Sequence, residues 1–139
     1  MRVVLDTNIV VSALLWGGDP SRLLRDGQAG EIALQTSPFL IAELFDVLGR
    51  THLAHRINAQ DISPEQLVAQ YQLFAAVVTP GNVPTVIADD PDDDHVLACA
   101  VEAHADLIVS GDKHLLRLGG YYRGIPIVRA AQAVQLINI

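Results

Sequence analysis

The chain has 139 residues, of which half are hydrophobic and 18% are charged, and its formal net charge is −7. This composition favours a single globular domain, residues 1–139, over a disordered chain. The negative charge argues against nonspecific attraction to nucleic acid, because that affinity comes largely from neutralising phosphates. A role on nucleic acid would therefore require metal ions or a local basic patch.

Cysteine content and hydrophobic runs predict the compartment. Cys99 is the only cysteine, so no disulfide can form within the chain. Asp6 and Asn8 interrupt the N-terminal hydrophobic run before it reaches the length of a signal peptide, and no segment offers the roughly 20 apolar residues of a membrane span. We expect a soluble, cytoplasmic protein without a membrane segment.

The first half of the sequence alternates between strand and helix patterns. Two strands and three helices are predicted: strands at 2–6 and 31–37, and helices at 7–18, 20–30 and 38–50. Ser37 followed by Pro38 is typical of a helix start. Glu43 lies at the edge of the hydrophobic face of the helix that follows, which is unusual for an acid that only contacts solvent.

The second half continues the alternation. The predicted elements are a helix at 63–78, a short strand leading into an acid-rich turn within 85–94, a helix at 94–105, a strand at 106–110, a turn and short helix at 111–118, a strand at 125–128 and a C-terminal helix. Alternating strands and helices indicate an α/β fold of three layers with a mostly parallel central sheet.

Two aspartates follow predicted strands. Asp6 ends the first strand, and Asp112 comes shortly after the strand at 106–110. In a parallel sheet, the carboxyl ends of the strands share one edge, where binding sites form. Asp6 and Asp112 therefore share this edge if the sheet is parallel, while Asp94 opens a helix and Glu43 lies within another.

Each acid also has an ordinary explanation. Asp6, Asp94 and Asp112 could cap helices, and Glu43 could be solvated. Solvation would also explain the remaining acids of the turn, Asp89, Asp90, Asp92 and Asp93. Together, however, two carboxylates about 4 Å apart repel by about 4 kcal/mol at an effective dielectric constant near 20, so their convergence requires a cation. Oxygen ligands without a His or Cys cluster suit Mg²⁺ or Mn²⁺, and the implied chemistry is metal-assisted phosphodiester hydrolysis.

Four segments, in order, carry a resemblance: VVLDTNIVVSALL, SPFLIAELFDVL, DPDDDHVLACAVEAHADLIVSGDKHLL and GIPIV. They resemble PIN-domain nucleases over nearly the whole chain, especially the toxin branch of toxin–antitoxin systems, the VapC-like proteins. The resemblance implies a set of catalytic and metal-binding acids with two supporting polar groups. The acids are Asp6, Glu43, Asp94 and Asp112, and the supporting groups are Asn8 and Ser110.

The resemblance further implies an Mg²⁺- or Mn²⁺-dependent endoribonuclease acting on RNA, a homodimer and an antitoxin partner. Asp92 or Asp93 could contribute instead of Asp94 or beside it. The rival interpretation is a catalytically weak PIN scaffold that binds RNA or a protein.

Basic residues could contact substrate phosphates, although surface solubility is the simpler explanation of them. The candidates are Arg22 with Arg25 and Lys113 with Arg117. We expect His95, His104 and His114 to be surface residues rather than catalytic bases.

Overall fold

A six-stranded sheet forms the centre of the computed structural model, which describes residues 1–87 and 90–138. The strand order is β3-β2-β1-β4-β6-β5, and every pairing is parallel except that of β5 with β6. The strands are β1 (Arg2–Leu5), β2 (Ala33–Thr36), β3 (Ala75–Val77), β4 (Leu107–Val109), β5 (Tyr121–Tyr122) and β6 (Ile125–Val128).

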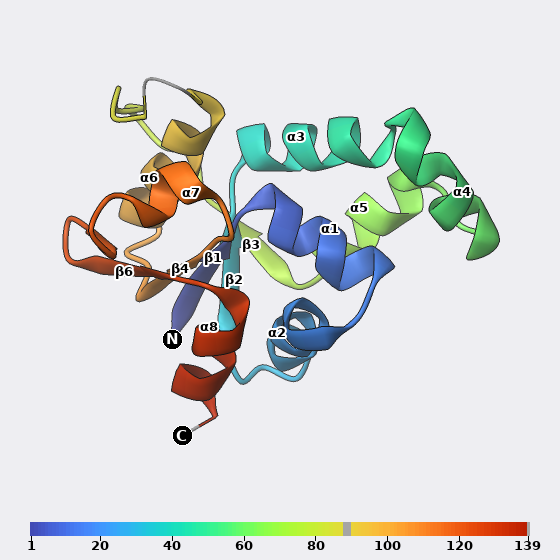
Figure 1. The fold of residues 1–139 in the computed structure, drawn as a ribbon, viewed down its shortest axis with the longest axis horizontal. Helices are drawn as coiled ribbons and strands as arrows, with labels where there is room; N and C mark the ends of the chain where they lie inside the picture. Colours follow the sequence, from blue (N-terminus) through green and yellow to red (C-terminus); the bar gives the residue numbers. More distant parts are fainter. Residues whose placement is uncertain (88–89, 139) are drawn as a thin grey trace.

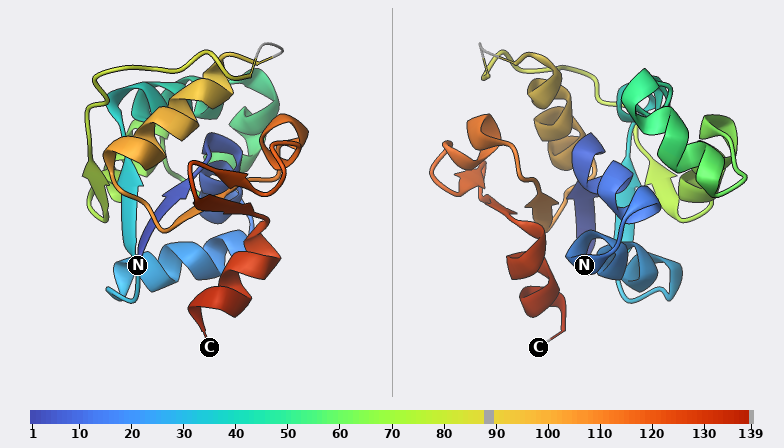
Figure 2. Two further views of the ribbon diagram at one scale, coloured as in Figure 1. Left: turned by 90° about the vertical axis from the view of Figure 1, so that its left-hand side faces the viewer. Right: turned by 45° about the vertical axis from the view of Figure 1, so that its right-hand side comes forward.

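Helices cover both faces of the sheet, which confirms the three-layer α/β prediction (Figures 1 and 2). They are α1 (Thr7–Leu15), α2 (Gly18–Gln28), α3 (Pro38–Leu48), α4 (Thr51–Ala59), α5 (Pro64–Gln72), α6 (Asp92–Glu102), α7 (Lys113–Leu116) and α8 (Ala130–Ile137). Among the described residues, no helix combines the length and the apolar character needed to cross a bilayer.

The core has two parts because successive side chains of a strand point to opposite faces. Val3 and Leu5 of β1 pack with apolar residues of α1, α2, α5 and α8. Val4 between them packs with residues of α6 and α7 on the other face. α3 contributes to both parts, through Leu44 to the first and Leu40 to the second.

The strand order changes direction beside β1. From β1 the chain proceeds to β2 and β3 on one side, and later returns to add β4 and β6 on the other. Leu5 at the end of β1 lies opposite Val109 at the end of β4. Such a point of reversal, at the carboxyl ends of parallel strands, is where open α/β sheets form their binding crevices.

Several predicted boundaries were wrong. The helix predicted at 63–78 ends at Gln72, and β3 follows it as an edge strand. The apolar run there does not distinguish helix from strand by periodicity, and pairing with β2 decides the outcome. The sequence prediction also missed α4 and β5, and residues 85–87 form no strand.

Candidate active site

Asp6 links the ends of β1 and β4. Its backbone N–H donates to the Val109 carbonyl at 3.0 Å, which continues the pairing of the two strands. Its side chain is buried, and Oδ1 accepts a hydrogen bond from the Ile9 N–H at 3.0 Å, so Asp6 caps α1. The hydroxyl of the fully buried Ser110 donates to Oδ2. The capping and the functional interpretations of Asp6 are therefore compatible.

Asp112 is held on the same edge of the sheet. Its backbone N–H donates to Ser110 Oγ at 2.9 Å, and its Oδ1 accepts from the His114 N–H at 2.7 Å at the start of α7. Ser110 thus contacts both aspartates. It fixes the position of one aspartate relative to the other.

Glu43 reaches the site from α3. The helix begins at Ser37, whose Oγ accepts from the Leu40 N–H at 3.3 Å. Glu43 is half-buried, and the hydroxyl of buried Thr7 donates to its Oε1. This contact joins the first turn of α1 to the middle of α3.

Asp93, rather than Asp94, faces the other acids. Single carboxylate oxygens of Asp90, Asp93 and Asp112 lie within 4.8 Å of one another. Asp93 is 8% exposed, and its Oδ2 is buried without a hydrogen-bond partner among the described residues. A buried oxygen without a partner is costly unless a ligand satisfies it. The carboxylate-only donor set fits a hard divalent cation.

The structure turns Asp94 away from this cluster. Its Oδ1 accepts hydrogen bonds from the Val86 and Ile87 N–H groups, at 3.0 and 2.8 Å. Asp94 therefore holds the preceding loop against α6, which begins at Asp92 and not at Asp94 as predicted. Asp89 lies outside the described residues.

Burial and mutual repulsion make the acids hard to ionise together. Burial raises the pKa of Asp6, and the charge of Asp112 raises it further, against the opposing effect of the Ser110 hydrogen bond. Burial and the neighbouring Asp112 and Asp90 raise the pKa of Asp93 to about 8. Burial also raises the pKa of Glu43, with Asp92 as the main charged neighbour that adds to it. A bound cation would remove this repulsion.

These side chains line one pocket of about 180 Å³. Its acids are Asp6, Glu43, Asp90, Asp92, Asp93 and Asp112, joined by Thr7, Asn8, Val47, Val96 and Arg50. Arg50, between α3 and α4, is the one basic residue among these lining residues, and its guanidinium lies 3.9 Å from Asp46. The sequence carried no signal for Arg50, because a single arginine after the end of a helix is an ordinary surface residue.

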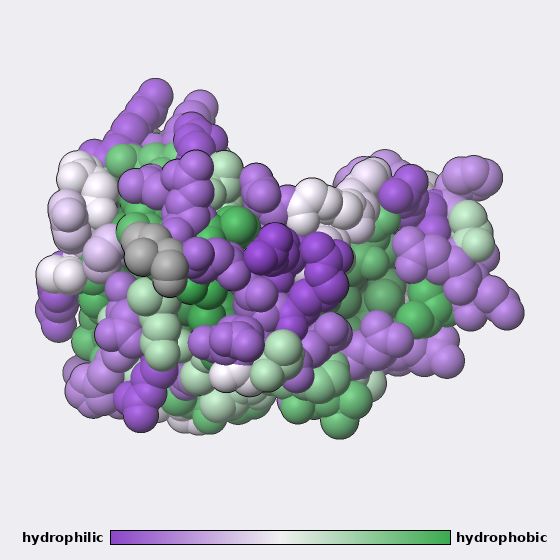
Figure 3. All heavy atoms as spheres, turned by 90° about the horizontal axis from the view of Figure 1, so that it is seen from below, coloured by the Kyte–Doolittle hydropathy of each residue, from purple (hydrophilic) through white to green (hydrophobic). Residues whose placement is uncertain are grey.

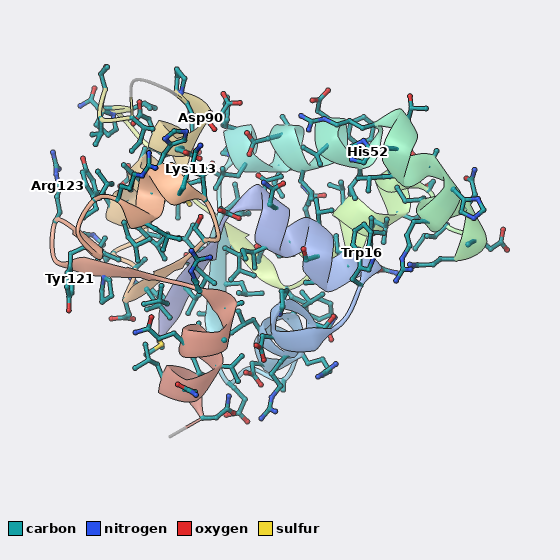
Figure 4. The ribbon with its side chains drawn as sticks, viewed as in Figure 1. Trp16, His52, Asp90, Lys113, Tyr121 and Arg123 are labelled. Carbon is teal, nitrogen blue, oxygen red and sulfur yellow. The ribbon has the colours of Figure 1, made fainter. Side chains whose placement is uncertain are left out.

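The predicted phosphate contacts separate into two groups. Arg22 and Arg25 lie on α2, at the end of the molecule opposite α3 and α6 (Figure 1), and Arg22 hydrogen-bonds Asn138 at 3.2 Å. That end presents a mostly hydrophilic surface with smaller hydrophobic patches (Figure 3). Lys113 lies near the acids at the start of α7, on the same side of the molecule as Asp90 (Figure 4). Arg117 is exposed just after α7.

The histidines do not line the acidic pocket. The His95 ring stacks on Phe39 with 3.4 Å between centroids, which joins α6 to α3. His104 is exposed after α6, and His114 contributes its backbone N–H to Asp112.

Comparison with known proteins agrees with this architecture. Residues 2–114 match the PIN domain. The chain belongs to the PIN-domain family. No curated protein matches this PIN domain. Among solved structures, the chain is similar to one of VapBC2 from Rickettsia felis, bound to a DNA fragment from the VapBC2 promoter. The two are 15% identical with a TM-score of 0.61, over 91% of this chain and 97% of the chain in that structure. At this identity the likeness shows the fold alone, and it confirms the predicted PIN-like architecture.

Proposed function

We propose that this PIN domain is a metal-dependent endoribonuclease, and that it is the VapC-like toxin of a toxin–antitoxin pair. Family membership and the likeness to the VapBC2 structure support the proposal. The observation that carries it is the convergence of carboxylates from four separate segments of the chain in one pocket. Asp93 Oδ2 is left buried without a partner there.

Asp90, Asp93 and Asp112 would hold Mg²⁺ or Mn²⁺, with Asp6 and Glu43 completing the acidic pocket. Asp93 thereby takes the role that the sequence resemblance assigned to Asp94. A bound ion of this kind activates water and stabilises the charge that develops on a phosphodiester during in-line hydrolysis.

The protein's own side chains orient these groups. Ser110 donates to Asp6 and accepts from the Asp112 backbone, and Thr7 donates to Glu43, so the carboxylates keep their positions before substrate binds. Arg50 lines the pocket and would contact a substrate phosphate there, where its positive charge offsets the acids. Lys113, at the start of α7, would contact the backbone of the RNA substrate on that side of the pocket.

The partners belong to the same proposal. A toxin requires an antitoxin, and the similar structure is a VapBC2 assembly. We also propose a homodimer formed through the apolar face of α3, α5 and β3. This face is lined by Pro38, Ile41, Ala42, Phe45, Val68 and Val77, together with the uncharged Gln72.

Cleavage of single-stranded RNA by the purified protein, with and without Mg²⁺ or Mn²⁺, tests the function. We expect metal-dependent cleavage that Asp6→Asn abolishes. Asp6→Asn should melt at a similar or higher temperature than wild type in metal-free buffer, because it removes carboxylate repulsion. The matched control is Asp19→Asn, an exposed acid on α2, which should cleave like wild type.

Equal cleavage by Asp6→Asn and wild type would contradict the catalytic role of the pocket. RNA binding without cleavage by the wild-type protein, in either metal, would favour the rival interpretation of a catalytically weak binding scaffold.

A further inference from the structure

A second hollow adjoins the acidic pocket. It has a volume of about 470 Å³, within the range of small-ligand sites, and lies between the start of α1 and the loop before α7. Its lining residues are Asn8, Ile9, Ser12, Gly111, Asp112 and Lys113. Asn8 and Asp112 also line the acidic pocket, so the two spaces are neighbours.

The walls of this hollow combine an apolar surface with unused polar groups. Ile9 forms the apolar part of the wall with its exposed 9%, and the rest of the residue packs in the core. Asn8 and Ser12 are one helical turn apart on α1 and therefore lie on one face of it. Neither side chain makes a hydrogen bond to the described residues, although Ser12 is half-buried. Lys113 adds an exposed positive charge at the rim (Figure 4).

We propose that this hollow binds the nucleoside next to the cleaved phosphate and reads its base. The inference rests on the proposed nuclease function. A base enters a pocket of this kind only when it is unpaired, so the substrate strand is single-stranded at this position. The Asn8 amide can donate and accept hydrogen bonds. Together with the Ser12 hydroxyl it would hydrogen-bond the edge of the base, which would lie against Ile9. Lys113 contacts a phosphate of the same RNA strand.

Mapping of cleavage sites in single-stranded RNA of random sequence tests the base reading. The wild-type protein with Mg²⁺ should prefer one base over the others, at one position beside the cut, by about tenfold, as a good polar contact to a base gives. Ser12→Ala and Asn8→Ala should each reduce this preference several-fold. Asn58→Ala, a matched change at an exposed position on α4, should leave it unchanged.

A binding measurement keeps the inference testable without cleavage. The four nucleoside 5′-monophosphates and inorganic phosphate are titrated, with Mg²⁺, into ¹⁵N-labelled protein. The monophosphates should shift the amide signals of Ile9, Ser12 and Lys113 by amounts that differ between bases, and phosphate alone should not reproduce the pattern. Ser12→Leu, which removes the hydroxyl and places a larger apolar side chain in the hollow, should lose the base-dependent shifts while keeping the shifts caused by Mg²⁺ alone.

The two proposals fail in different ways. Base-dependent shifts without RNA cleavage would overturn the nuclease function and leave a nucleoside-binding site. RNA cleavage without any base preference would overturn the proposal that the hollow reads a base. A base preference that is the same in Ser12→Ala, Asn8→Ala and wild type would overturn it too. Equal shifts for all four monophosphates and phosphate would overturn it as well.

Discussion

At the scale of single residues, carboxylates of the site serve local structure and the pocket together. A carboxylate has two oxygens and accepts several hydrogen bonds, so Asp6 caps α1 with Oδ1 and binds Ser110 with Oδ2. Asp112 likewise caps α7 and lies within reach of Asp90 and Asp93. A capping role is therefore no evidence against a functional one at these positions.

Neighbouring aspartates on α6 should differ in their effect on metal binding. We expect Asp93→Asn to weaken Mg²⁺ binding by about tenfold or more, because it removes a charged ligand. Asp94→Asn should leave the affinity close to wild type, because the amide oxygen can still accept from the Val86 and Ile87 N–H groups. Calorimetric titration with Mg²⁺ measures both variants. The reverse order of affinities would assign the ligand to Asp94.

At the scale of elements, the start of α1 connects three parts of the fold. The backbone of Asp6 extends the β1–β4 pairing, its side chain caps α1, and Thr7 in the next position binds Glu43 on α3. The relative placement of α1, α3 and β4 therefore sets the distances between the acids. Packing of both core parts against α3 supports this placement.

Loss of the Thr7 hydroxyl should loosen the connection between α1 and α3. Thr7→Val keeps the shape of the side chain but leaves the half-buried Glu43 without this donor, at a cost of about 1–3 kcal/mol in the free energy of unfolding. Thr7→Ser keeps the hydroxyl and should recover most of that loss. Urea denaturation with added Mg²⁺ measures both. Equal stability of the two variants would show that the hydrogen bond contributes nothing.

At the scale of the whole molecule, we expect the concentration of acids at one edge of the sheet to make the stability of the fold depend on pH and on divalent metal. Asp93 has a pKa of about 8 in the folded protein and about 4 in an unfolded chain. Between these values the folded state binds more protons than the unfolded state. The free energy of unfolding therefore falls as the pH rises through this window.

Melting temperatures in metal-free buffer should fall from pH 5 to pH 8. Mg²⁺ should oppose the fall, because it replaces protons as the source of positive charge. Asp93→Asn should show a shallower pH dependence than wild type, since it lacks the titrating group. A wild-type protein whose stability rises across this range, or parallel curves for the two proteins, would contradict the raised pKa.

We expect two copies of the chain to form a dimer through the apolar face of α3, α5 and β3. Phe45 is 45% and Val77 52% exposed, and β3 is an edge strand. In a chain of net charge −7, an uncharged face lets two copies approach with least repulsion. Val77→Lys should convert a dimer to a monomer in sedimentation experiments, whereas Val83→Lys, on the loop before α6, should not. A monomeric wild-type protein at high concentration would exclude this dimer.

Periodicity and turn residues were sufficient to predict much of the fold. Ser37 with Pro38, and Ser63 with Pro64, marked two helix starts that the structure confirms. α4 was missed because Leu53 and Ile57 are its only buried residues, which gives a weak hydrophobic period. β3 was taken as helix because a short apolar run becomes a strand only when a neighbouring strand is available.

Local patterns in the sequence were enough to predict that Asp6 and Asp112 follow strands and that acids gather around the start of α6. The resemblance assigned the metal-binding role to Asp94 and left Asp92 and Asp93 open, since three successive aspartates differ only in where a helix directs them. In the tertiary structure Asp93 lies beside Asp90 and Asp112, whereas Asp94 accepts hydrogen bonds from the Val86 and Ile87 N–H groups, and our proposal for Asp93 rests on this difference. The tertiary structure also brought Arg50 and the hollow beside Ser12 to the acids, contacts that depend on packing between distant segments.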